Sequence, residues 1–252
     1  VYFLLRRFVI GDKALKTREN VRLHPRARAG GISRDSLIVG GFILLHVGAR
    51  FTGAAAGVAQ HGGDVWQPFA NTFAGIALGG LSAGALNILW HVAWWLALGS
   101  ILLFLPYFPY TKHAHLFMGP VNFATRPERG ALGALNAVDF SNDDQEKFGA
   151  TWLSDLSQTQ VLDAFACIMC NRCQDACPAY TTGKQLSPAA LELNKRYYIR
   201  DNFIALAAGA EDSVPLLDFA LTESAMWACT SCGACNAVCP VGNEPLHDIM
   251  EM

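Results

Sequence analysis

The sequence predicts an all-α chain in two parts, with membrane-spanning helices first and a water-soluble helical part after them. Hydrophobic residues make up 52% and charged residues 16% of the 252 residues, but the two kinds are unevenly distributed. Residues 51–111 contain no Lys or Arg, and Asp64 is their only acidic residue. From Phe123 onward the composition is that of an ordinary soluble protein. A net charge of −2 gives no indication of a nucleic-acid partner.

Two long apolar segments, residues 36–59 and 86–108, each approach the roughly 20 residues that a helix needs to cross a bilayer. The first is rich in Gly and Ala, which allow helices to approach closely in lipid. A shorter glycine-rich stretch, residues 66–81, predicts a re-entrant or interfacial helix. Residues 1–7 resemble the end of a further membrane helix, and residues 246–252 the start of another helix. We therefore expect the sequence to be part of a longer chain.

The distribution of basic residues predicts the orientation of these helices. Residues 6–34 carry nine Lys and Arg against two acidic residues, and such stretches remain on the cytoplasmic side of a membrane. Residues 60–84 are then external, and the second helix returns to the cytoplasm near Lys112. The water-soluble part is expected on the cytoplasmic face of a bacterial or archaeal membrane.

All eight cysteines lie in two copies of one pattern, Cys-x₂-Cys-x₂-Cys-x₃-Cys-Pro. This is the spacing of bacterial ferredoxins with two [4Fe–4S] clusters, in which the fourth cysteine of each run binds the other cluster. The expected ligands are Cys167, Cys170, Cys173 and Cys239 for the first cluster, and Cys229, Cys232, Cys235 and Cys177 for the second. Zinc sites require neither the third closely spaced cysteine nor the Cys-Pro, and disulfides require an oxidising compartment.

Histidines in or beside the apolar segments are candidate ligands of haem b or contacts of a quinone, because ionisable groups in a bilayer are costly and usually functional. They are His46 in the first span, His91 near the outer end of the second, and His113 and His115 near its inner end. The alternative is a histidine that hydrogen-bonds between helices or lies at headgroup level, and this interpretation is favoured for His61.

Helix geometry relates two of these candidates. His91 and His113 are about 40° apart around a straight helix and about 33 Å apart along it, as two haems near opposite membrane faces require. Pro106 and Pro109 are expected to kink or end that helix, which leaves His115 an equal candidate. Lys112 could contact a quinone headgroup or a haem propionate.

Several segments resemble known families. Residues 109–115 and 120–122 resemble the end of the last helix in membrane haem b proteins related to the nitrate reductase gamma subunit. Residues 162–167, 171–180, 182–188 and 227–235 resemble heterodisulfide-reductase-like cluster proteins. The combined arrangement is similar to membrane oxidoreductases that join a haem b anchor, a two-cluster ferredoxin and a C-terminal cysteine-rich domain, among them electron-transfer-flavoprotein:menaquinone oxidoreductases.

The resemblance implies one or two haem b groups, a quinone as substrate, a helical ferredoxin fold and a cytoplasmic redox partner such as electron transfer flavoprotein or another flavoprotein. Asn171 departs from the family, which often has glycine there. The first membrane helices and the cysteine-rich domain of that family are absent from these residues.

The 50 residues between the two cysteine runs have helical patterning. Ser187 and Pro188 predict a helix start, and residues 216–227 predict another helix. Five residues are expected at the surface or in ordinary packing, namely Lys195, Arg196, Tyr197, Tyr198 and Arg200. Residues 139–147 are polar and predict a linker or a solvated face.

These observations predict a membrane anchor at residues 1–122, a linker at residues 123–160 and a dicluster ferredoxin domain at residues 161–252. The expected function is electron transfer within a larger, lipid-embedded quinone oxidoreductase, between a cytoplasmic partner, two [4Fe–4S] clusters, haem b and the quinone pool. The alternatives are a haem-free membrane-anchored ferredoxin, or a subunit of a thiol/disulfide enzyme.

Overall fold

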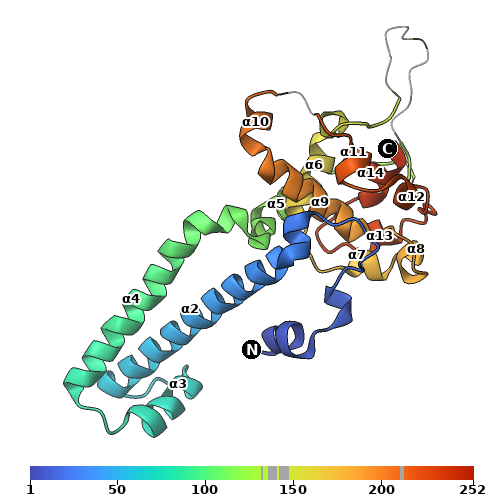
Figure 1. The fold of residues 1–252 in the computed structure, drawn as a ribbon. Helices are drawn as coiled ribbons and strands as arrows, with labels where there is room; N and C mark the ends of the chain where they lie inside the picture. The colour runs from blue at the N-terminus through green and yellow to red at the C-terminus, as the bar shows by residue number, and fades with distance from the viewer. Residues whose placement is uncertain (132, 136–140, 142–147, 211–212) are drawn as a thin grey trace. The chain divides into compact units, whose positions relative to one another are not determined.

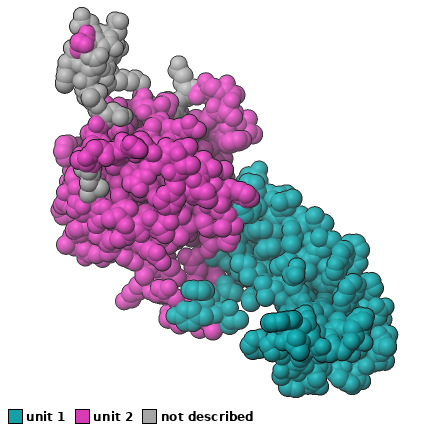
Figure 2. All heavy atoms as spheres, turned by 180° about the vertical axis from the view of Figure 1, so that it is seen from behind, with its two compact units in different colours: residues 1–4, 33–111 teal, residues 5–32, 112–252 magenta. Residues whose placement is uncertain are grey.

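The computed structural model describes residues 1–131, 133–135, 141, 148–210 and 213–252, and every regular element in these ranges is helical (Figure 1). The predicted all-α fold is therefore confirmed. Apart from Ser141, the predicted linker at residues 139–147 falls outside the described residues. The chain forms two compact units, coloured in Figure 2. We call Val1–Leu4 with Ser33–Thr111 the apolar unit, and Leu5–Ile32 with Lys112–Met252 the cysteine unit.

Two long helices dominate the apolar unit (Figure 1). Its elements are α1 (Tyr2–Leu4), α2 (Ile32–His61), α3 (Pro68–Phe73), a π-helical turn (Ala74–Leu78), α4 (Ala83–Tyr107) and a 3₁₀ turn (Phe108–Tyr110). The stretches Ala27–His61 and Ala83–Tyr110 each contain an 18-residue window with a mean hydropathy of 1.6 and 2.0, respectively, and are long and apolar enough to cross a membrane. As predicted, regular α-helix ends beside Pro106 and Pro109.

Helices α2 and α4 run antiparallel, as three contacts along their lengths show. The Tyr107 hydroxyl donates to Asp35 (3.3 Å), and the rings of Phe42 and Phe104 stack with centroids 4.1 Å apart. Farther along, a Cβ added to Gly53 would lie 3.4 Å from the Cβ of Ala93. Small residues thus bring the two backbones together where a larger side chain would separate them.

The stretch predicted as a re-entrant or interfacial helix forms α3 and the π-helical turn after it. Ala70, Ala74 and Leu78 are buried against Ala55 and Ala56 of α2. The opposite face, which includes Phe69 and Ile76, is largely exposed. The location of this stretch at a membrane interface stays a prediction.

Short helices arranged around α9 (Pro188–Asp201) make up the cysteine unit. The others are α5 (His115–Thr125), α6 (Gln158–Ala166), α7 (Arg172–Asp175), α8 (Pro178–Thr181), α10 (Phe203–Ala207), α11 (Leu216–Phe219), α12 (Glu223–Met226), α13 (Ala234–Ala237) and α14 (Pro245–Glu251). Shorter turns lie at Leu5–Ile10, Lys13–Leu15, Ala27–Gly31, Lys112–Ala114 and Leu153–Asp155. The predicted start of α9 is confirmed, since the Ser187 hydroxyl accepts the Ala190 N–H (3.1 Å) and Pro188 is the first helical residue.

The structure corrects two sequence predictions for this unit. Lys195 and Arg196, which were expected at the surface or in ordinary packing, are completely buried, because α9 is covered on several sides by α6, α7, α11 and α14. Residues 216–227 form two short helices instead of one, because the Thr222 hydroxyl accepts the Ala225 N–H (3.2 Å) and starts a new helix, α12.

The basic stretch before α2 packs onto the cysteine unit. In residues 12–28, which we call the strap, the Arg18 guanidinium lies 4.4 Å from the ring centroid of Tyr180. Arg26 pairs with Asp201 (2.5 Å). By its contacts the strap belongs to the cysteine unit, as do residues 112–122, whereas the predicted anchor at residues 1–122 included both. Which residues lie in a membrane stays a prediction.

Asn194 joins the strap to the core. This fully buried side chain accepts the His24 N–H (2.7 Å) and donates to the carbonyl oxygens of Arg22 (3.0 Å) and Ala220 (2.8 Å). We expect Asn194→Leu to leave these three backbone groups without a hydrogen-bond partner. Each buried group that finds no water should lower the free energy of unfolding by about 1–3 kcal/mol. The result should be a lower midpoint of urea unfolding and faster tryptic cleavage at Arg22.

The matched control is Asn20→Ala, because the Asn20 amide also joins the strap to the cysteine unit, at the carbonyl oxygen of Gly183, but is exposed. Equal effects of the two substitutions would contradict the anchoring role of Asn194.

Candidate metal centres

The two cysteine runs have the same backbone conformation. In each, the second and fourth residues after the first cysteine are left-handed, at Met169 (φ 56°), Asn171 (φ 64°), Ser231 (φ 52°) and Gly233 (φ 70°). The Met169 N–H donates to the Cys167 sulfur and the Ser231 N–H to the Cys229 sulfur, both at 3.4 Å. Each loop then enters a short helix, α7 or α13. The repeated sequence pattern is therefore a repeated structure.

Asn171 has a left-handed backbone, which explains why the related family often has glycine at this position. Asparagine is among the few residues that tolerate a left-handed backbone. Its amide donates to the carbonyl oxygen of Ala14 (3.1 Å), and the residue is only 5% exposed. The equivalent Gly233 has no side chain that could make such a bond. Asn171 thus joins the first cysteine loop to the strap.

The four thiols predicted for the first cluster line one cavity, with Glu192 and Asn243. The Cys239 sulfur accepts the Asn243 N–H (3.3 Å). Burial raises the pKa of Cys167 to about 12, and the carboxyl of Glu192 adds to this effect. Such thiols are protonated at neutral pH, and cationic iron would replace their protons. The cavity therefore fits a group that binds thiolates.

The second set also comes together across the two runs. Burial, together with the thiols of Cys229, Cys177 and Cys232, raises the pKa of Cys235 to about 12. Cys232 is exposed, whereas Cys177 and Cys235 are buried. Within the described ranges, no three His, Cys, Asp or Glu side chains converge on one metal ion. A cube does not require this, because its four thiolates bind four different irons.

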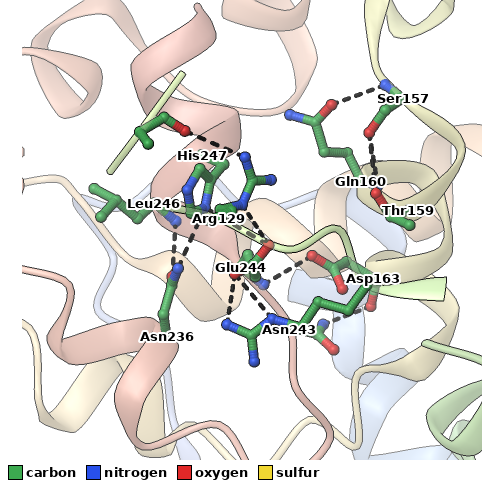
Figure 3. Close-up of polar contacts among 12 residues, drawn as sticks. Arg129, Ser157, Thr159, Gln160, Asp163, Asn236, Asn243, Glu244, Leu246 and His247 are labelled. Atoms are coloured by element: carbon green, nitrogen blue, oxygen red, sulfur yellow. Dashed lines mark hydrogen bonds and ion pairs between the residues drawn. The ribbon is translucent and has the colours of Figure 1, made fainter. Parts of the chain in front are cut away.

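A buried polar network holds the loop that carries Cys239 (Figure 3). The carboxylate of Asp163 in α6 accepts the Glu244 N–H (2.8 Å) and the amide of Asn122 in α5 (2.6 Å). The Asn243 amide donates to the Asp163 carbonyl oxygen (2.6 Å), and Arg129 donates to Glu244 (2.9 Å). Burial raises the pKa of Asp163 to about 7. The roles of these residues were not predicted from the sequence, because isolated polar residues on different elements form no sequence pattern.

Lys195 lies at the centre of a second buried group of charges. Its ammonium donates to Asp248 and to the carbonyl oxygen of Gln160 (2.8 Å), and it is 3.0 Å from Glu192. Burial lowers the pKa of Lys195, but the carboxylates of Asp248 and Glu192 outweigh it and raise the pKa. Burial raises the pKa of Glu192 well above its usual range. Asp248 is therefore the main counterion of a charged Lys195.

The candidate histidines fall in different units. In the apolar unit, the Nδ1 atom of His46 is 3.1 Å from the Ala97 carbonyl oxygen, whereas His91 is exposed and has its ring edge-on to Trp90. In the cysteine unit, His113 and His115 have ring centroids 5.7 Å apart, and the Nδ1 atom of His115 is 2.6 Å from the carbonyl oxygen of Lys112. The expected relation between His91 and His113 stays a prediction.

His46 lines a cavity of about 620 Å³ in the apolar unit. Small residues of α2 and aromatic residues of α4 form its walls, and Arg50, His61, Asp64 and Gln67 add polar groups. His91 does not line it. The sequence analysis did not single out Arg50, although an arginine in an apolar helix is a signal of function. His61 was expected to be structural, yet it lies on this cavity.

The left-handed backbone at Asn171 leads to a testable expectation. Asn171→Gly should keep the cysteine loop intact, whereas Asn171→Val should strain it by about 1–2 kcal/mol or more and lower the iron and sulfide content of the purified protein. Ile168→Val, in the same loop but outside the left-handed positions, is the control. Equal iron content in the Gly and Val variants would contradict this account.

Comparisons with known proteins agree with the geometry of the cysteine loops. The family described as 4Fe-4S dicluster domain matches residues 163–243. The chain is 34% identical to the probable iron-sulfur-binding oxidoreductase FadF of Bacillus subtilis, over 77% of this chain and 32% of that protein. It is 30% identical to EtfAB:quinone oxidoreductase of Syntrophomonas wolfei, over 74% of this chain and 29% of that protein.

A probable membrane-anchored ferredoxin of Chromohalobacter salexigens is 25% identical over 55% of this chain and 24% of its own length. No solved structure matches. The chain thus spans about a third or less of the length of these curated relatives. It carries a dicluster domain whose eight cysteines serve two [4Fe–4S] clusters, and it is related to iron–sulfur oxidoreductases.

Proposed function

We propose that this chain is the electron-transfer part of a membrane-bound quinone oxidoreductase. The observation that carries the proposal is the presence, in one chain, of two thiol sets that each draw on both cysteine runs, and of two apolar helices enclosing a cavity with a hydrogen-bonded histidine. The relatives named as an oxidoreductase and as an EtfAB:quinone oxidoreductase support the same activity.

The thiols would hold two [4Fe–4S] cubes in the crossed sets, with Cys239 completing the first and Cys177 the second. When bound, these cubes supply one-electron transfer. The chain contributes the positions of the thiols, and the N–H groups of Met169, Ser231 and Asn243 donate to the sulfurs. Such donors stabilise thiolates and influence the potential of a cluster.

His46 is the candidate that best fits a haem b. Its Nδ1 atom is 3.1 Å from a carbonyl oxygen, which leaves Nε2 for a metal, and metal-binding histidines are usually oriented by such a bond. His61 lies 15 residues farther along α2, a rise of about 22 Å, so the two cannot bind one iron. Arg50, one turn from His46, suits a propionate or a quinone oxygen.

Lys112, His113 and His115 remain candidates for a second haem or for the quinone headgroup. Their short separation, with ring centroids of the two histidines 5.7 Å apart, would let them act on one ligand. They precede and begin α5, whose Asn122 is bonded to the loop of the first thiol set. A ligand here would therefore lie in the same unit as that set.

The basic strap supports a cytoplasmic location for the cysteine unit, because Lys- and Arg-rich segments next to membrane helices remain on that side. A cytoplasmic redox protein, such as an electron transfer flavoprotein, would then exchange electrons with the clusters. The competing proposal is a haem-free anchor for a ferredoxin, which the likeness to a membrane-anchored ferredoxin favours.

A dithionite-reduced minus oxidised spectrum of the detergent-purified protein, with haem, iron and sulfide measured per chain, separates these proposals. We expect a b-type band that a quinone analogue partly bleaches. Iron and sulfide for two clusters without any haem band would leave the anchored ferredoxin.

The same spectrum tests the assignment of His46. We expect His46→Ala to remove or strongly reduce a b-type band, since Ala provides no ligand nitrogen, and to leave the iron and sulfide content unchanged. His91→Ala, which alters an exposed side chain outside the cavity, should keep the band. The reverse result would transfer the ligand role to His91.

A further inference from the structure

The two thiol sets have different surroundings. The first lines a cavity together with Glu192 of the buried helix α9. The second lies near the surface, because Cys232 is exposed and the neighbouring Trp227 is 77% exposed. The charged groups that act on the pKa of Cys229 and Cys235 are other cysteines, whereas the pKa of Cys167 also responds to Glu192 and Arg196.

Arg196 lies directly behind the first set. Its side chain is fully buried, and a guanidinium N–H donates to the carbonyl oxygen of Cys167 (3.3 Å). The guanidinium carbon is 5.8 Å from the ring centroid of Phe165. These contacts hold a cation in a defined position one helical turn after Glu192, whose carboxyl lines the cavity.

The charge of Arg196 is permanent. A guanidinium keeps its proton at any pH that a protein tolerates. Buried charges are also poorly screened by water and salt. Arg196 therefore supplies a fixed positive field at the first thiol set.

A positive field affects a cluster in a known direction. The potential of an iron–sulfur cluster depends on net charge, hydrogen bonds and solvent exposure. Reduction adds one negative charge, so a nearby buried cation stabilises the reduced form and raises the potential. We propose that Arg196 is a positioning residue that raises the reduction potential of the cluster bound by Cys167, Cys170, Cys173 and Cys239, and has no such effect on the other cluster.

This inference rests on the proposed pair of clusters. It is tested by redox titration of the cluster-loaded, detergent-purified chain, followed by electron paramagnetic resonance at a single pH. Cys239→Ser and Cys229→Ser first assign the two signals to the two sets. Arg196→Gln keeps an N–H donor without the charge, Arg196→Met removes both, and Arg196→Lys keeps the charge. Arg200→Gln, one turn farther along α9 and partly exposed, is the control.

We expect Arg196→Gln and Arg196→Met to lower the potential of the first cluster only, and Arg196→Lys and Arg200→Gln to leave both potentials near those of the wild type. The proposal is overturned if Gln matches the wild type while Lys lowers the potential, since a hydrogen bond would then be responsible. Unchanged potentials in all variants, equal shifts of both clusters, or loss of the first cluster in every Arg196 variant would also overturn it.

Failure of the proposed function is a separate result. A wild-type protein with iron for fewer than two cubes would refute the paired clusters themselves. Two normal clusters that quinone does not oxidise would refute the quinone activity and leave the role of Arg196 standing.

Discussion

The loop that carries Cys239 has to be held against a loop from the other cysteine run, and Asp163 provides the holding contact. Its carboxylate accepts the backbone N–H of Glu244, which is 81 positions later in the chain, and the amide of Asn122. It acts together with the bonds from Asn122 to Val241 and from Asn243 to the Asp163 carbonyl oxygen, which hold the same loop. Arg126 and Arg129 form ion pairs with the carboxylate of Glu244 and so help to hold this contact.

Buried charge is the common feature of the cysteine unit. Asp163, Lys195 and Arg196 all lie in its interior, where each charge requires a partner. Thiolate clusters are anionic, so an interior that surrounds them can accommodate cations that would be unfavourable in an apolar core. Helix α9 contributes Glu192 to the cavity and Lys195 as the counterion of Asp248. The same helix carries Asn194, whose amide binds the strap.

The sequence predicted the features that have a period or a spacing. Cysteine spacing predicted two crossed sets, hydropathy predicted α2 and α4, and Ser187 with Pro188 predicted the start of α9. It did not predict the burial of Lys195 and Arg196, because charges on a helix normally indicate a solvated face and only tertiary packing decides otherwise. Arg50 was also missed, and the position of His61 on the cavity was not foreseen, since a cavity depends on how two helices meet. Ligand roles for the histidines stay predictions.

The order of synthesis determines when the strap can bind to the rest of the cysteine unit. The Asn194 side chain, which binds the backbone of the strap, comes 170 positions after His24. The ribosome therefore completes α2 and α4 before the strap has a surface to bind. During that interval the strap remains available to solvent, chaperones and proteases. The cysteine unit can therefore close around the strap only after the residues of both apolar helices have been synthesised.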